Sequence, residues 1–295
     1  MGGVADIPIP ALAGVAGASL FDADVLRAYA DGELGRAIAH LGWHAGRVHE
    51  GVHQARKSLR RTRAVLALGA PILGPGAALI DREVRRVNRR LSRMRDTQAL
   101  VETLDRLIGK KSTPEETLPV LRRARRTAAQ ARAEGARREL ADDPNLGRKR
   151  AVLTMLRAGL QALPWESLTG TRVRDALADG LQRVDASGAL ARAGGRDEDW
   201  HRWRRRVRRL SQQHRAVGDL IPEIEPARKH VKTLAELLGE TQDYSLLREH
   251  CGKRSIFSEP DRYVLRDLAD SGTARMRERI ERSLTAPADA TTAST

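Results

Sequence analysis

The chain has 295 residues, with 53 Lys and Arg against 38 Asp and Glu, a formal net charge of +15. This charge favours a polyanionic partner such as nucleic acid, polyphosphate or an anionic membrane surface. Aromatic residues make up only 3% of the chain, which argues against a single-stranded nucleic-acid binder that stacks bases. The single cysteine, Cys251, excludes an internal disulfide, and no apolar run reaches the length of a membrane span. We therefore expect a cytoplasmic protein without membrane contact.

Helical periodicity runs through almost the whole chain, and no alternating strand pattern appears, so the sequence predicts an all-α fold. Residues 1–20 and 286–295 are dominated by small residues, and we expect a disordered arm and a disordered tail there. Between them, Gly and Pro separate the expected helices. These helices cover about 22–41, 53–68, 77 to a cap or kink at Asp96, 114–140, 147–163, 171–192, a stretch from about 200, one with Lys229 and Lys232 that ends near Asp243, and 259–284.

The stretch from His53 to Leu68 has a polar front and an apolar back. On a helical wheel its front carries one imidazole and a row of cations: His53, Arg56, Lys57, Arg60 and, at the edge, Arg61. Its back carries Val52, Ala55, Leu59, Thr62 and Leu66. Arginine suits phosphate because its planar guanidinium donates two parallel hydrogen bonds to one anion.

The same pattern of cationic and apolar residues recurs 148 residues later in the chain. His201, Arg204, Arg205 and Arg208 occupy the positions of the first cationic front, and Trp200, Trp203, Val207 and Leu210 occupy the apolar back. Asp243 follows at the place of Asp96, with an offset of 147 residues. Two matched helices with the same downstream order predict an internal duplication.

A second basic helix follows the first front and carries Arg82, Arg85, Arg86, Arg89 and Arg93. Its counterpart in the second half carries Lys229 and Lys232. Glu236 and Glu240, however, stand opposite Arg89 and Arg93 in the repeat. We therefore expect the first half to supply more cations to any shared site.

The pattern His-x-x-Arg-Lys-x-x-Arg-Arg-x-Arg at 53–63, the following basic helix and Arg95-Asp96, all duplicated, resemble the CHAD family (conserved histidine α-helical domain). The resemblance covers residues 21–285. It implies two antiparallel four-helix bundles, residues 21–143 and 145–285, related by a pseudo-twofold axis around a basic central groove or pore. It also implies non-enzymatic binding of inorganic polyphosphate and an association with polyphosphate granules.

The resemblance and the helical wheels together indicate a set of phosphate-binding residues. They are His53, Arg56, Lys57, Arg60, Arg61, Arg63, Arg82, Arg85, Arg86, Arg89, Arg93, His201, Arg204, Arg205, Arg208, Arg209, Lys229 and Lys232. The second repeat departs from the family pattern at Ser211 and Gln212. The two histidines have two main interpretations: each donates to phosphate, or each hydrogen-bonds a neighbouring helix and fixes its packing.

Other functions have weaker support. A DNA or RNA binder is the alternative that the charge permits, although no helix-turn-helix, zinc finger or RNP motif appears. No Walker loop, dinucleotide fingerprint or nucleophile constellation appears, so we expect no catalytic residue and no cofactor. His40, His44, His49 and His53 cannot converge on one continuous helix, so we expect no metal site. Asp96 and Asp243 are interpreted as helix caps. The sequence does not indicate an oligomeric state.

Overall fold

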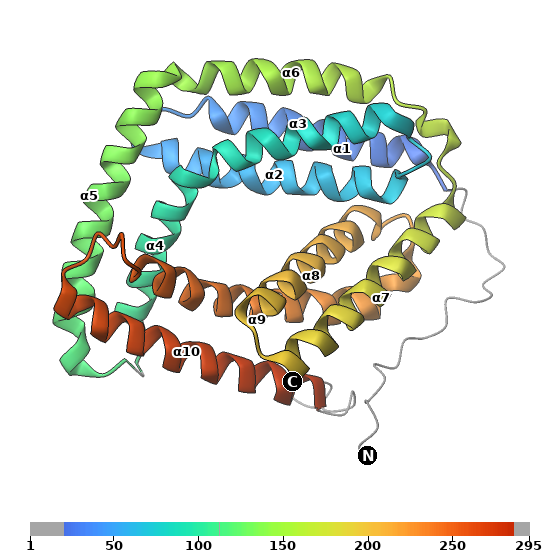
Figure 1. Cartoon of the computed structure of the whole chain (residues 1–295). Helices are drawn as coiled ribbons and strands as arrows, with labels where there is room; N and C mark the ends of the chain where they lie inside the picture. Colours follow the sequence, from blue (N-terminus) through green and yellow to red (C-terminus); the bar gives the residue numbers. More distant parts are fainter. Residues whose placement is uncertain (1–20, 112, 286–295) are drawn as a thin grey trace, which may run out of the picture.

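The computed structural model describes residues 21–111 and 113–285, and this part of the chain forms ten α-helices and no β-strand (Figure 1). The predicted all-α fold is therefore confirmed for these residues. The expected arm, 1–20, and tail, 286–295, lie outside them. None of the described helices is long and apolar enough to cross a membrane.

The helices end where local signals predict. Asp22 caps the first helix, since its carboxylate accepts a hydrogen bond from the backbone N–H of Asp24 at 2.8 Å. Gly195 ends the seventh helix with a φ of 64°, which glycine adopts without strain. The helices are α1 (Ala23–Leu41), α2 (Val48–Gly69), α3 (Gly74–Arg90), α4 (Ser92–Gly109), α5 (Leu118–Asp142), α6 (Gly147–Gln161), α7 (Gly170–Gly194), α8 (Asp197–Val217), α9 (Glu225–His250) and α10 (Glu259–Thr285).

Four helices, α1, α2, α3 and α6, pack around one part of the core (Figure 1). We expected α6 to pack with the second half of the chain, but it lies on α1 and α3. Leu153 and Leu160 of α6 are fully buried there. Arg157 of α6 also forms two hydrogen bonds, of 2.6 and 2.8 Å, with Asp31 of α1. The apolar face of α6 thus covers helices from the first half.

The remaining helices connect the two halves of the sequence. α7 packs on α8, α8 on α9 and α9 on α10, while α4 packs on α5. Contacts of α2 with α8 and of α4 with α9 then cross between the halves. As a result, α2 with His53 and α8 with His201 lie against each other.

The apolar backs of α2 and α8 are buried as predicted. Leu59 and Val207 are fully buried, and Trp203 is 2% exposed. Complete burial of an aliphatic side chain stabilises a fold by roughly 1.5–3 kcal/mol. On α3, in contrast, Leu79 is 48% exposed.

The interpretation of Asp96 and Asp243 as helix caps is wrong. The break between α3 and α4 falls at the buried Leu91, so Asp96 lies inside α4. α9 continues without a break past Asp243. The Asp243 carboxylate accepts a hydrogen bond of 2.5 Å from Arg106 of α4, rather than one from a backbone N–H. It therefore joins α4 to α9.

A close approach of α7 and α8 gives the first prediction. A Cβ atom at Gly188 would lie 2.9 Å from the ring of the buried Trp203. We expect Gly188→Ala to destabilise the protein by about 1–2 kcal/mol in urea unfolding, because the ring cannot move aside. Gly135→Ala is the matched control. Its Cβ would meet nothing within 4 Å, so alanine should stabilise α5 by up to about 1 kcal/mol. Equal effects of the two substitutions would contradict the close approach.

Buried His214 gives a second prediction. It is 3% exposed, its Nδ1 has no hydrogen-bond partner, and burial followed by repulsion from Arg228 lowers its pKa to about 4. The unfolded chain binds a proton near pH 6.5 and the folded chain does not. Falling pH between these values therefore removes stability, by about 3 kcal/mol in total. In urea unfolding, the His214→Leu variant should lose less stability than the parent protein as the pH falls from 6.5 to 4. An equal loss of stability in His214→Leu and in the parent protein would contradict this assignment.

Candidate functional site

Five arginines from three helices form what we call the central cluster. Arg56 and Arg60 belong to α2, Arg95 to α4, and Arg204 and Arg208 to α8. All five side chains are neither fully buried nor fully exposed. Arg60 is repelled by Arg208, Arg56, Arg204 and Arg95, which shows that the guanidiniums of all three helices lie near one another.

Burial and like charge both disfavour the charged form of these arginines. Burial is the main cause that lowers the pKa of Arg204 to about 9, and repulsion from Arg208 adds to it. Burial likewise lowers the pKa of Arg56 to about 10, with repulsion from Arg95 and Arg208 opposed by attraction to Asp96. Both values lie well above neutral pH, so these guanidiniums carry their charge in the ligand-free protein.

Few counter-charges neutralise the central cluster. Arg95 forms an ion pair of 3.0 Å with Glu102, and Arg56 donates to the backbone carbonyl of Asn88. Within the described residues, Arg60, Arg204 and Arg208 form no ion pair with a carboxylate. Nε of Arg56, Nε of Arg204 and Nη1 of Arg95 are buried without a hydrogen-bond partner. Donors of this kind are costly to leave unpaired, and a bound anion would satisfy them.

The two histidines flank the central cluster but differ in their hydrogen bonds. His53 lies near Arg95 of α4 and its buried Nδ1 has no hydrogen-bond partner, whereas His201 Nδ1 hydrogen-bonds Oε1 of Gln242 of α9 at 2.7 Å. Arg95 and Gln242 follow their histidines by 42 and 41 residues. Burial is the first cause that lowers the pKa of both imidazoles, which favours their neutral forms at pH 7. The His201 contact supports a packing role for that ring.

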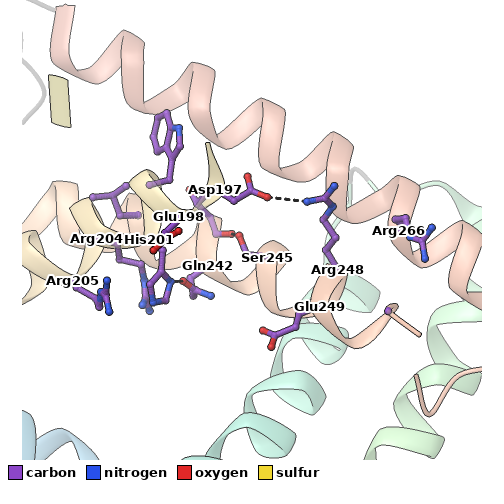
Figure 2. Close-up of a pocket in the computed structure, with 14 residues that line it drawn as sticks. Asp197, Glu198, His201, Arg204, Arg205, Gln242, Ser245, Arg248, Glu249 and Arg266 are labelled. Atoms are coloured by element: carbon purple, nitrogen blue, oxygen red, sulfur yellow. Dashed lines mark hydrogen bonds and ion pairs between the residues drawn. The ribbon is translucent and has the colours of Figure 1, made fainter. Parts of the chain in front are cut away.

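A cavity of about 690 Å³ adjoins the central cluster between α8 and α9. Figure 2 shows Arg204, His201 and Arg205 on one side of it and Arg248 with Glu249 on the other. Asp197 pairs with Arg248 at 2.8 Å, so this rim carries both signs of charge. Arg204 therefore belongs to a surface that small solutes can reach.

Arg61 and Arg63 of α2 pair with carboxylates outside the central cluster, and Lys57 lies at its edge, near Arg60. Arg61 pairs with Glu33 of α1 at 3.0 Å and donates to Gln212 of α8 at 3.3 Å. Arg63 forms two hydrogen bonds, of 2.8 and 3.1 Å, with Asp81 of α3. Lys57 lies near Arg61 and Arg215. The carboxylates on α1 and α3 thus neutralise Arg61 and Arg63.

The other predicted residues fall into two sets. Arg82 and Arg86 are exposed and pair with Glu83, and Arg89, Lys229 and Lys232 are also exposed; the structure does not bring these five to the central cluster. The side chain of Arg93 lies outside the described residues. Arg85, Arg205 and Arg209 line a separate cavity.

Arg95 and Gln242 are the residues that the predicted set lacks. Both follow a histidine at nearly the same spacing, which is the signal in the sequence that could have identified them. For metals, no group of three or more His, Cys, Asp or Glu side chains in the described part of the chain could hold an ion.

The crowded guanidiniums give a third prediction. Arg60→Met should raise the stability of the ligand-free protein by about 1 kcal/mol at low salt, because it removes one like charge from a half-buried group. The gain should shrink as salt rises. Arg63→Met is the control on the same helix, and it should lower stability because it leaves Asp81 unpaired. Thermal unfolding of both variants measures this, and destabilisation by Arg60→Met would contradict net repulsion at the cluster.

Comparison with known proteins places the chain in a family. The family model of the CHAD domain matches residues 28–252. The crystal structure of the CHAD domain from the plant Ricinus communis is similar to this fold, with a TM-score of 0.60 and 17% sequence identity over 90% of this chain and 92% of that chain. No curated protein matches the sequence. Since the family model spans more than half of the residues, the chain belongs to the CHAD family.

Proposed function

We propose that this protein binds inorganic polyphosphate without catalysing a reaction on it, in the cytoplasm and at polyphosphate granules. The observation that carries the proposal is the central cluster. It gathers five guanidiniums from three helices, and three of them have no ion pair within the described residues. The repulsion among these guanidiniums lowers the stability of the folded protein, and a bound polyanion would relieve it.

The spacing of the cluster suits a linear chain of phosphates. Arg56 and Arg60 lie one helical turn apart on α2, as do Arg204 and Arg208 on α8, so each helix offers cations about 6 Å apart. Polyphosphate presents no base edge and no fixed shape, so recognition depends on charge density and on phosphate oxygens. Guanidiniums meet both needs, because they stay charged and donate two hydrogen bonds to one phosphate.

We also propose that the site arises from duplication, with a pseudo-twofold axis that exchanges α2 with α8. Two observations support this. Arg95 and Gln242, which lie near His53 and His201, follow these histidines by 42 and 41 residues, and α2 packs on α8. In this arrangement α6 is a connecting helix outside the repeat, because it packs on α1 and α3. The basic groove then lies where the halves meet.

Nucleic acid is the alternative partner. The exposed Arg82, Arg86 and Arg89 on α3 could contact the phosphates of a duplex without sequence preference. The half-buried guanidiniums of the central cluster favour a flexible single chain of phosphates, because a rigid duplex cannot follow a recessed group. Long-chain polyphosphate should therefore displace duplex DNA at equal phosphate concentration, and DNA should displace polyphosphate poorly.

A low-salt titration with long-chain polyphosphate tests the proposal. The parent protein should bind, affinity should fall steeply with salt, and the melting temperature should rise, since a ligand at 100 times its Kd adds about 2.7 kcal/mol of stability. A variant with glutamine at the four cluster positions Arg56, Arg60, Arg204 and Arg208 should lose most of this binding. Calorimetry measures affinity, and circular dichroism verifies the helical content of the variant.

The matched control removes the same number of charges from exposed positions. It carries glutamine at Arg82, Arg86, Arg122 and Arg126, which lie on α3 and α5. If the two variants bind polyphosphate equally, the charge acts diffusely and the nucleic-acid alternative is favoured. Release of orthophosphate from polyphosphate with Mg²⁺ or Mn²⁺ would contradict a non-enzymatic role.

A further inference from the structure

A second basic cavity, of about 480 Å³, lies between α2, α3, α7 and α8. Among the described residues, seven arginines and four other residues line it, and no carboxylate does. The lining residues are Arg63, Ala67, Arg85, Gly180, Arg183, Arg202, Arg205, Arg206, Arg209, Leu210 and Gln213. A cavity of this size is typical of small-molecule sites.

Nearby acids neutralise only part of this charge. Arg63 pairs with Asp81 at 2.8 Å, Arg202 with Asp199 at 3.4 Å and Arg183 with Asp179 at 3.8 Å. The other four arginines of the lining form no ion pair within the described residues: Arg85, Arg205, Arg206 and Arg209. The cavity thus presents about four uncompensated positive charges in a small volume.

The guanidiniums of this lining are close enough to act on one ligand. Arg209 of α8 is repelled by Arg63 of α2, Arg183 of α7 and Arg85 of α3, so all four helices contribute charge to one point. Arg206 donates a 2.9 Å hydrogen bond to the backbone carbonyl of Arg183, which holds its side chain against α7. Four helices therefore bring these cations to one cavity.

This cavity is separate from the central cluster. Arg206 and Arg209 leave α8 on a different side from Arg204 and Arg208, because successive helical residues are rotated by about 100°. The two sets of residues have no member in common. Arg205 lies between them, since it also lines the cavity beside His201.

We propose that this cavity is a binding site for a compact oligophosphate, a group of two or three adjacent phosphates. Such a group concentrates several negative charges in a volume that fits the cavity, and its oxygens accept the paired donors of guanidiniums. A single carboxylate would leave most of the charge uncompensated. Within the described part of the chain, no aromatic side chain lines the cavity, so a base would have no ring on which to stack, and the assignment is to free oligophosphate rather than to a nucleotide.

Calorimetry with tripolyphosphate tests this site. Arg85→Gln combined with Arg206→Gln should weaken binding by at least about tenfold, because it removes two charged donors from the cavity. Arg82→Gln combined with Arg86→Gln removes two exposed arginines of α3 that do not line the cavity, and should change affinity by no more than about twofold. Arg85→Gln alone is a second variant at an exposed position, in case the double variant folds poorly.

Two further experiments distinguish this cavity from the polyphosphate site at the central cluster. Arg60→Gln combined with Arg208→Gln should weaken the binding of long-chain polyphosphate more than that of tripolyphosphate, whereas Arg85→Gln combined with Arg206→Gln should have the larger effect on tripolyphosphate. A larger loss of tripolyphosphate binding in the Arg60 and Arg208 variant than in the Arg85 and Arg206 variant, or an equal loss in the Arg82 and Arg86 control, would overturn the proposal. ATP should bind no more tightly than tripolyphosphate, and tighter binding of ATP would overturn the assignment to free oligophosphate. A different result would contradict the proposed function: long-chain polyphosphate binding to the variant of the central cluster as tightly as to the parent protein.

Discussion

The structure depends on holding like-charged guanidiniums together between α2, α4 and α8. Two buried backs make this possible, because Leu59 on α2 and Val207 on α8 are fully buried, with Trp203 beside them. Each such side chain stabilises the fold by roughly 1.5–3 kcal/mol, whereas a like-charge pair one turn apart on an exposed helix costs roughly 0.2–0.5 kcal/mol. Burial therefore outweighs repulsion several times, and the helices can present a cationic front without unfolding.

Acidic neighbours decide which arginines remain available for binding. Glu33 on α1 and Asp81 on α3 neutralise Arg61 and Arg63, which then join helices to one another. No carboxylate reaches Arg60 in the same way within the described residues, although it lies on the same helix. The arginines of α2 look alike in the sequence but differ in the structure. Some form ion pairs that hold neighbouring helices together, and others keep their donors available for a ligand. Which of the two an arginine does depends on whether a carboxylate from another helix lies within reach.

The sequence predicts the parts of this molecule that local spacing controls. The helices and their buried backs follow from apolar residues three and four apart, so Leu59 and Val207 were placed correctly. The position of α6 on α1 and α3 has no local signal, because several apolar faces compete for the same core. Aspartate is a common helix cap, yet the carboxylate of Asp243 accepts a hydrogen bond from Arg106 on another helix. Arg95 reaches the cluster because α4 crosses near α2, and helical periodicity does not reveal this crossing. Only the spacing of Arg95 from His53, matched by that of Gln242 from His201, points to it.

The place of α6 has a consequence for how the chain folds during its synthesis. α1, α2 and α3 leave the ribosome first, but the helix that covers α1 and α3 is encoded more than fifty residues after α3 ends. Until Leu153 and Leu160 emerge, the apolar surface that they cover stays open to water and to other nascent chains. α4 and α5 are translated in that interval, so the order of translation exposes the N-terminal helices to premature association before their cover arrives.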